Sequence, residues 1–219
     1  MALNKLKYNS LNITPAANKA IGFDSDADAL EATLEAGAMT FISKVTASSS
    51  GTVDFTSGID STYKEYLFLF NDIHPATDDV VFSFQVDTGT NTSYNQVVTS
   101  TSFAAQHGES DSPTELSDTG TDRRFSQQQV FQPLSGHNDL GNDNDQALSG
   151  TLHIFNPAST TFVKHFIATT NQAGFENRSV NSFIAGYFNT TTALTRVRFK
   201  MSSGNIDAGT FKLYGIKDS

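Results

Sequence analysis

Carboxylates near the start of the chain have part of the spacing of a calcium-binding loop. Asp24, Asp26 and Asp28 alternate along the sequence, and Glu35 occupies the twelfth position of the same stretch. Such a loop also needs glycine at its sixth position for a sharp turn, and this sequence has Ala29 there. The favoured interpretation is therefore a helix whose N-terminus is capped by acidic residues.

A second oxygen-rich stretch lies further along the chain. Asp139, Asp143 and Asp145 are interleaved with Asn142 and Asn144. Carboxylate and amide oxygens of this kind suit Ca²⁺ in a loop. A solvated turn has the same composition and is the favoured interpretation, so the sequence assigns no metal ligand.

No set of residues has the pattern of a catalytic site. The chain lacks a Gly-x-Ser-x-Gly elbow, a His-Glu-x-x-His motif and a glycine loop that could hold phosphate. Three acids lie in predicted strands, and nothing in the sequence pairs them: Asp54, Glu65 and Asp87. The five histidines are scattered: His74, His107, His137, His153 and His165. The last two alternate with apolar residues and are interpreted as structural. We expect no enzyme, with no catalytic or cofactor-binding residues.

Composition sets the class of protein. The 219 residues include 18 Phe but no Trp and no Cys, which indicates a phenylalanine-rich core without disulfides or thiolate chemistry. The net charge of −9 argues against a nucleic-acid partner, since binding phosphates requires basic surface. No apolar run is long enough to cross a membrane, and no secretory signal is recognisable. We expect neither membrane insertion nor nucleic-acid binding.

The N-terminal part is expected to be an arm rather than part of the core. Residues 1–23 have neither helical nor strand periodicity, and they carry Lys5, Lys7 and Lys19 without an acid. An extended docking arm is predicted. Strong helix formers over Asp26–Ala36 predict one short helix. The predicted domains are thus residues 1–38, arm and helix, and residues 39–219, a β domain.

From Met39 onward the chain has the period-2 alternation of strands. Many short strands without intervening helices predict an all-β fold, a β-sandwich of jelly-roll type, although a Greek-key arrangement gives the same pattern. The predicted strands are 40–47, 52–56, 63–70, 80–87, 94–104, 125–131, 148–155, 161–170, 180–188, 194–201 and 210–216. Between them, residues 105–124 and 133–147 are predicted to be exposed acidic loops that carry recognition.

Four segments resemble a group of virion structural proteins of tailed, marine and cyanophage-like bacteriophages. They are Leu6–Pro15 (LKYNSLNITP), Ala27–Glu31 (ADALE), Thr62–Pro75 (TYKEYLFLFNDIHP) and Ser203–Ile216 (SGNIDAGTFKLYGI). The resemblance implies a β-sandwich, often trimeric, that is attached to the particle by an N-terminal arm. It indicates virion origin more specifically than it indicates head or tail position.

The expected function is therefore that of a non-enzymatic virion structural protein, a capsid decoration, fibre or tail-associated component. Its expected partners are copies of itself in a homotrimer and other virion proteins. Thr and Ser at alternate strand positions could pack against a neighbouring copy. The alternative is a tail fibre or tip that binds a host receptor or surface glycan, for which Tyr94 and Phe131 lie only at loop edges. A glycan-cleaving depolymerase is disfavoured, because no β-helix repeat is present.

Overall fold

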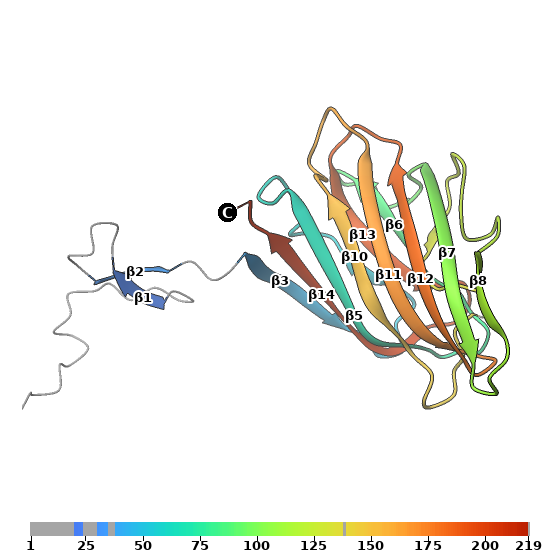
Figure 1. Ribbon diagram of the computed structural model, residues 1–219. Helices are drawn as coiled ribbons and strands as arrows, with labels where there is room; N and C mark the ends of the chain where they lie inside the picture. The colour runs from blue at the N-terminus through green and yellow to red at the C-terminus, as the bar shows by residue number, and fades with distance from the viewer. Residues whose placement is uncertain (1–19, 24–29, 35–37, 138, 219) are drawn as a thin grey trace, which may run out of the picture. The chain divides into compact units, whose positions relative to one another are not determined.

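The computed structural model describes residues 20–23, 30–34, 38–137 and 139–218 (Figure 1). The chain divides into two compact units, one within residues 1–40 and the other comprising residues 41–218. Each unit is described separately, and the second contains nearly all of the described side chains.

The first unit contains an antiparallel pair of strands, β1 (Ala20–Phe23) and β2 (Leu30–Leu34). The predicted helix over residues 26–36 is therefore wrong at Leu30–Leu34, and its remaining residues lie outside the described part of the chain. Residues 1–19 of the predicted arm also lie outside it. Helix propensities differ by only a fraction of a kcal/mol per residue, so hydrogen bonding to a partner strand outweighs them.

The rest of the described chain is all-β and contains no helix, as the alternation predicts. It forms two antiparallel sheets. The large sheet has eight strands in the spatial order β3 (Met39–Thr46), β14 (Ile206–Ile216), β5 (Glu65–Pro75), β10 (Leu148–Phe155), β11 (Lys164–Gly174), β12 (Arg178–Phe188), β7 (Val98–Gly108) and β8 (Thr114–Asp118). The small sheet has four, in the order β4 (Val53–Phe55), β13 (Leu194–Met201), β6 (Phe82–Thr88) and β9 (Gln132–Pro133).

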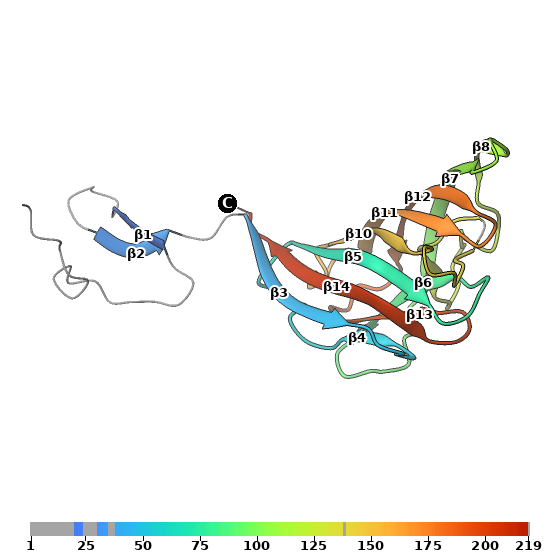
Figure 2. The same cartoon turned by 90° about the horizontal axis from the view of Figure 1, so that it is seen from below.

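The small sheet covers one face of the large sheet, which makes a β-sandwich (Figure 2). Phenylalanine fills the space between the sheets, as the composition predicts. Phe199 of β13 lies at its centre, with six other rings within 6.3 Å of its own, centroid to centroid: Phe55, Phe68, Phe70, Phe82, Phe84 and Phe211. This apolar layer fixes which face of each strand points inward, and so which points to solvent.

Two predicted segments in this part of the chain differ from the structure. Residues 105–124 are not one loop, because β7 continues to Gly108 and pairs with the edge strand β8. Residues 125–131 are not a strand; only Gln128 bridges to Val98. The short, polar β8 shows no alternation because its residues are mostly exposed on both faces. A strand with no buried face leaves no periodic signal in the sequence.

Candidate functional site

The most distinctive surface of the protein is the face of the large sheet that points away from the small sheet. We call it the outer face and define it by the outward residues of the four strands β10, β11, β12 and β7. These are Ser149, Thr151, His153, Phe155, His165, Ile167, Thr169, Asn171, Ala173, Ser179, Asn181, Phe183, Ala185, Tyr187, Thr99, Thr101, Phe103, Ala105 and His107. None of them is Asp, Glu, Lys or Arg, although the chain has 23 acidic residues.

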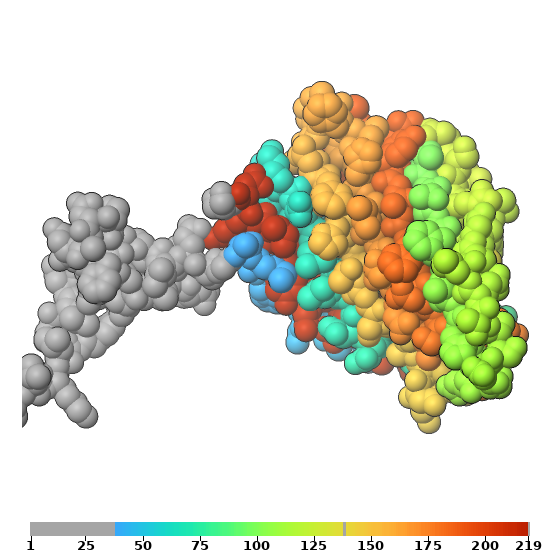
Figure 3. All heavy atoms as spheres, viewed as in Figure 1, coloured from blue at the N-terminus to red at the C-terminus, as the bar shows by residue number. Residues whose placement is uncertain are grey.

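Two phenylalanines lie at the centre of the outer face. Phe183 of β12 pairs directly with Phe103 of β7, and their rings stack with centroids 4.9 Å apart and an interplanar angle of 11°. Their exposed fractions are 39% and 47%, and nearby Ile167 on β11 is 51% exposed. Figure 3 views the protein from the side of this face, with β10, β11, β12 and β7 toward the viewer. Exposed, contiguous apolar side chains on a protein surface are typical of a binding site.

A hollow of about 540 Å³ lies at one end of the outer face. Aromatic side chains of Phe155, His165 and Tyr187 line it, together with the hydroxyl-bearing Thr99 and Thr101. The His165 and Tyr187 rings meet edge to face with centroids 5.9 Å apart. The hollow thus combines apolar ring faces with neutral hydrogen-bonding groups.

Two small residues of β12, Ala185 and Gly186, line this hollow. Of the two, Gly186 faces the interior of the sandwich, between the inward-facing Ile184 and Phe188. A Cβ atom on Gly186 would lie 2.5 Å from the carbonyl oxygen of Thr99 and 2.8 Å from the ring of Phe166. Because neither neighbour has room to move away within a packed sheet, glycine is required here.

The outer surface of the small sheet is different in kind, because it carries charges that are paired. The Arg198 guanidinium donates to both carboxylate oxygens of Asp54, at 2.7 and 2.6 Å, and lies 4.1 Å from the centre of the Tyr94 ring. Lys200 lies over the Phe131 ring at 4.5 Å. Tyr94 is buried under these contacts. The two aromatic residues that the sequence placed at loop edges are therefore covered by cations.

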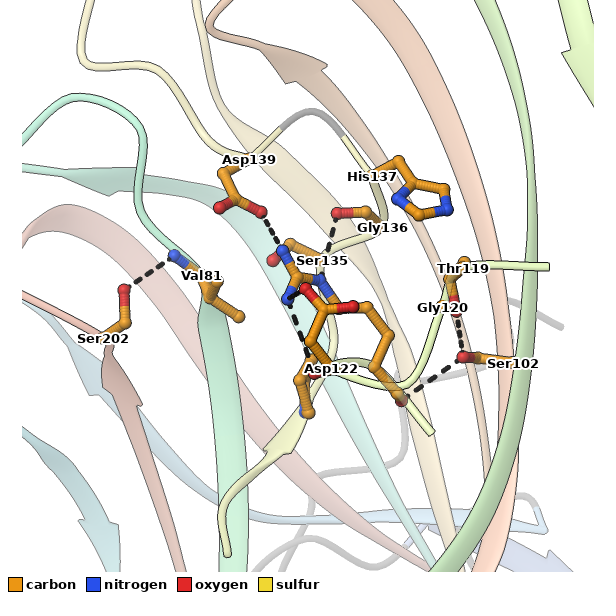
Figure 4. Close-up of polar contacts among 12 residues, drawn as sticks. Val81, Ser102, Thr119, Gly120, Asp122, Ser135, Gly136, His137, Asp139 and Ser202 are labelled. Carbon is orange, nitrogen blue, oxygen red and sulfur yellow. Dashed lines mark hydrogen bonds and ion pairs between the residues drawn. The ribbon is translucent and has the colours of Figure 1, made fainter. Parts of the chain in front are cut away.

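A buried polar cluster supports the outer face from within the sandwich. Its centre is Arg123, whose guanidinium donates to Asp139, to Asp122 at 2.7 Å and to the carbonyl oxygen of Gly136 at 3.4 Å (Figure 4). The backbone carbonyl of Arg123 in turn accepts from Gln132 at 2.9 Å. These bonds join residues 122 and 123 to Gln132, Gly136 and Asp139.

A second group of bonds fastens the cluster to the strands themselves. The Ser102 hydroxyl on β7 pairs with Thr119, and the Gly136 N–H donates to Gln172 of β11 at 3.1 Å. The predicted exposed loop 133–147 is consequently wrong over most of its length. Leu134, Leu140 and Gln146 are buried, and only residues 142–145 are exposed as a run.

The candidate calcium ligands are not brought together. Burial raises the pKa of Asp139, and the Arg123 guanidinium partly offsets this effect, so the carboxylate already has a cationic partner. Among the described residues, no group of three or more His, Asp or Glu side chains could hold a metal ion. Asp24, Asp26, Asp28 and Glu35 lie outside those residues.

The acids and histidines singled out from the sequence lie apart. Asp54 pairs with Arg198, and Asp87 is buried, accepting from the Tyr94 N–H at 2.7 Å and from Gln96 at 3.0 Å. Three histidines contact polar groups near the ends of strands: His74, His107 and His137. His153 and His165 project from the outer face rather than into the core.

Sequence reasoning missed Phe103, Phe183 and Tyr187 as candidate binding residues. The signal in the sequence is the absence of Asp, Glu, Lys and Arg at the outward positions of four separate strands. It becomes visible only when the four strands are considered together. No family model matches this chain, and no curated protein or solved structure is similar to it. The described part of the chain also has no helix that could cross a lipid bilayer.

Proposed function

We propose that this protein is a non-enzymatic structural component of a bacteriophage virion, a capsid decoration, fibre or tail-associated protein. Its β-sandwich, which we assign to the jelly-roll type, would form a homo-oligomer, with a trimer expected. The observation that carries this proposal is the uncharged, aromatic outer face. The virion is proposed as the location because of the resemblance inferred from the sequence segments Thr62–Pro75 and Ser203–Ile216.

The outer face has the composition of an assembly surface. The core of a protein–protein interface is distinguished by few charged residues and by enrichment in aromatic residues. Phe103 and Phe183 provide the aromatic centre, and hydroxyl and amide side chains surround them. A face of this kind contributes binding energy through burial.

The N-terminal segment would attach the protein to the particle. Residues 1–23 carry three lysines and no acid, whereas the whole chain has a net charge of −9. A basic arm ahead of an acidic body suits docking onto other, negatively charged virion proteins.

Mass spectrometry of purified phage particles from the source of this sequence tests the proposal. The protein should be present at a fixed ratio to the major capsid or tail proteins, and antibodies against the β-sandwich should label particles in electron micrographs. Its absence from purified particles, with the protein found only free in infected-cell lysate, would refute a structural role.

A second candidate function is recognition of a neutral host glycan by a tail fibre or tip. The hollow beside Phe155, His165 and Tyr187 favours it. A pyranose ring presents C–H groups that stack on aromatic faces, while its hydroxyls can bond with Thr99, Thr101 and the imidazole. A glycan array tests this function, and Tyr187→Ala should abolish any binding that it detects.

A further inference from the structure

We propose that the outer face is the surface through which one copy of this chain binds another, with Phe183 at the centre of the contact. The inference rests on the proposed function, because it names the surface through which the structural protein assembles. Four observations carry it: the charge of the face, its area, the position of its aromatic centre and the chemistry of the neighbouring sheet edge.

The charge of the outer face indicates which kind of partner it can bind. Each copy has a net charge of −9, so an interface between two copies is destabilised wherever it brings like charges together. The outer face avoids this cost, since no Asp, Glu, Lys or Arg projects outward from β10, β11, β12 or β7, and its basic side chains are the histidines His107, His153 and His165. A basic protein would be matched by an acidic face, and nucleic acid by a basic one. An uncharged face fits a partner whose own face is uncharged, which another copy provides.

The area of the outer face is that of a stable interface. Strands β7, β11 and β12 are each 11 residues long. At roughly 3.4 Å per residue they extend about 37 Å, and four strands at about 4.8 Å spacing are about 19 Å wide. The product, roughly 700 Å² on each copy, is close to the roughly 800 Å² per partner of standard complexes.

Phe183 occupies the middle of this area. It is the third of the five outward residues of β12, and Phe103 holds the same place on β7. Large aromatic residues near the geometric centre of an interface contribute most of its binding energy, because the surrounding contacts exclude water from them. A symmetry axis that passes near Phe183 would bring equivalent rings together in a dimer or a trimer.

The edge of the sheet next to the outer face is strand β8, and its composition is unsuited to strand pairing, so association is not expected through this edge. Strand β8 has only five residues, follows Pro113 and carries Glu115 and Asp118. Arg124 reaches across to Asp118, donating from Nε at 2.9 Å. Short, charged edge strands prevent edge-to-edge association.

Sedimentation velocity of the full chain tests the proposal. Phe183→Asp places a charge at the centre of the outer face, and the control Phe162→Asp makes the same change at a phenylalanine that is 67% exposed in the loop before β11. The wild type and the control should sediment at two or three times the 23.7 kDa chain mass. Phe183→Asp should raise the association midpoint at least about 30-fold, as loss of a central hot spot does.

Charge rescue makes the test independent of folding defects. Phe183→Lys alone should also dissociate, and mixing it with Phe183→Asp should restore the oligomer, because opposite charges then meet near the axis. Circular dichroism and thermal melting should show that both variants remain folded. If one of the two variants is destabilised on its own, recovery of the oligomer in the mixture still shows that position 183 lies at the contact.

Four outcomes would overturn the inference. The wild type could remain at 23.7 kDa up to about 100 μM, a weak limit for a specific interface. The oligomer could survive Phe183→Asp, or both Phe→Asp variants could dissociate equally. A monomer that binds a neutral oligosaccharide, and loses it with Tyr187→Ala, would assign the face to glycan recognition. Presence of the protein in purified particles is measured separately, so a monomeric virion protein would refute this inference without refuting the proposed function.

Discussion

Arg123 and Arg124 are neighbours in the sequence with opposite environments, and they allow a matched test of the buried polar cluster. Arg123 is buried and bonds with Asp139, Asp122 and the Gly136 carbonyl. Arg124 is exposed, and its ion-pair partner is the exposed carboxylate of Asp118. Replacing each arginine with methionine removes the charge and retains most of the side-chain volume.

The expected loss of unfolding free energy differs several-fold between the two variants. Arg123→Met leaves the largely buried Asp139 carboxylate without a cation and the Gly136 carbonyl without its donor. Breaking a buried pair in this way costs roughly 3–5 kcal/mol, and partial exposure of Asp139 places the expectation at about 3 kcal/mol. Arg124→Met should cost about 0–1 kcal/mol, as exposed ion pairs do. Urea denaturation followed by fluorescence and circular dichroism measures both values.

The pH dependence identifies Asp139 as the cause. Burial raises the pKa of this carboxyl in the folded state, so its contribution to stability is fully present below the unfolded pKa and is lost as pH rises through the folded pKa. Removing the Arg123 cation raises the folded pKa further. The deficit of Arg123→Met relative to wild type should therefore be larger at pH 7 than at about pH 4, where an unperturbed Asp is half protonated.

A second substitution completes the test. Adding Asp139→Asn to Arg123→Met should recover part of the loss at pH 7, because the unpaired charge is gone. Equal losses for Arg123→Met and Arg124→Met, or a deficit that grows as pH falls, would refute the assignment of Arg123 as the centre of the cluster.

Three further predictions concern other parts of the protein. Lys164→Met should lower stability by about 3 kcal/mol, since the buried ammonium donates to three carbonyls, of Ser159, Phe162 and Thr190, at 2.7, 2.7 and 3.2 Å; an unchanged urea midpoint would contradict this. Phe199→Ala should cost about 4 kcal/mol, because six rings surround it, and Phe199→Leu should cost less than half as much in the same assay. Deleting residues 1–23 should leave the melting temperature of the sandwich nearly unchanged while preventing incorporation into particles; a fall of more than about 5 °C would place the segment in the core.

The sequence by itself determined the fold class and the character of the core. Alternation in segments such as 194–201 follows from a strand with one buried side, a property of each strand alone, and the structure confirms it. The abundance of phenylalanine likewise predicted its core. Predictions from local sequence were wrong where the structure depends on pairing between strands or on a strand without a buried face. Leu30–Leu34 has helical propensity but pairs with β1, and β8 has no buried face to produce a period.

Only the tertiary structure decided which surface could bind a partner. Phe103 and Phe183 belong to strands far apart in the sequence, and the register of β7 with β12 places them side by side. A phenylalanine at an outward position of a strand can be covered by another part of the chain or exposed to solvent, and the sequence of that strand does not distinguish the two cases. Residues 133–147 show the converse. Their polar composition predicts exposure to solvent, yet Gly136 bonds with Arg123 and Gln172, and the buried Gln146 donates to the carbonyl oxygen of Gly174. Burial depends on partners that distant parts of the chain supply, and those partners are fixed only when the sheets pack together.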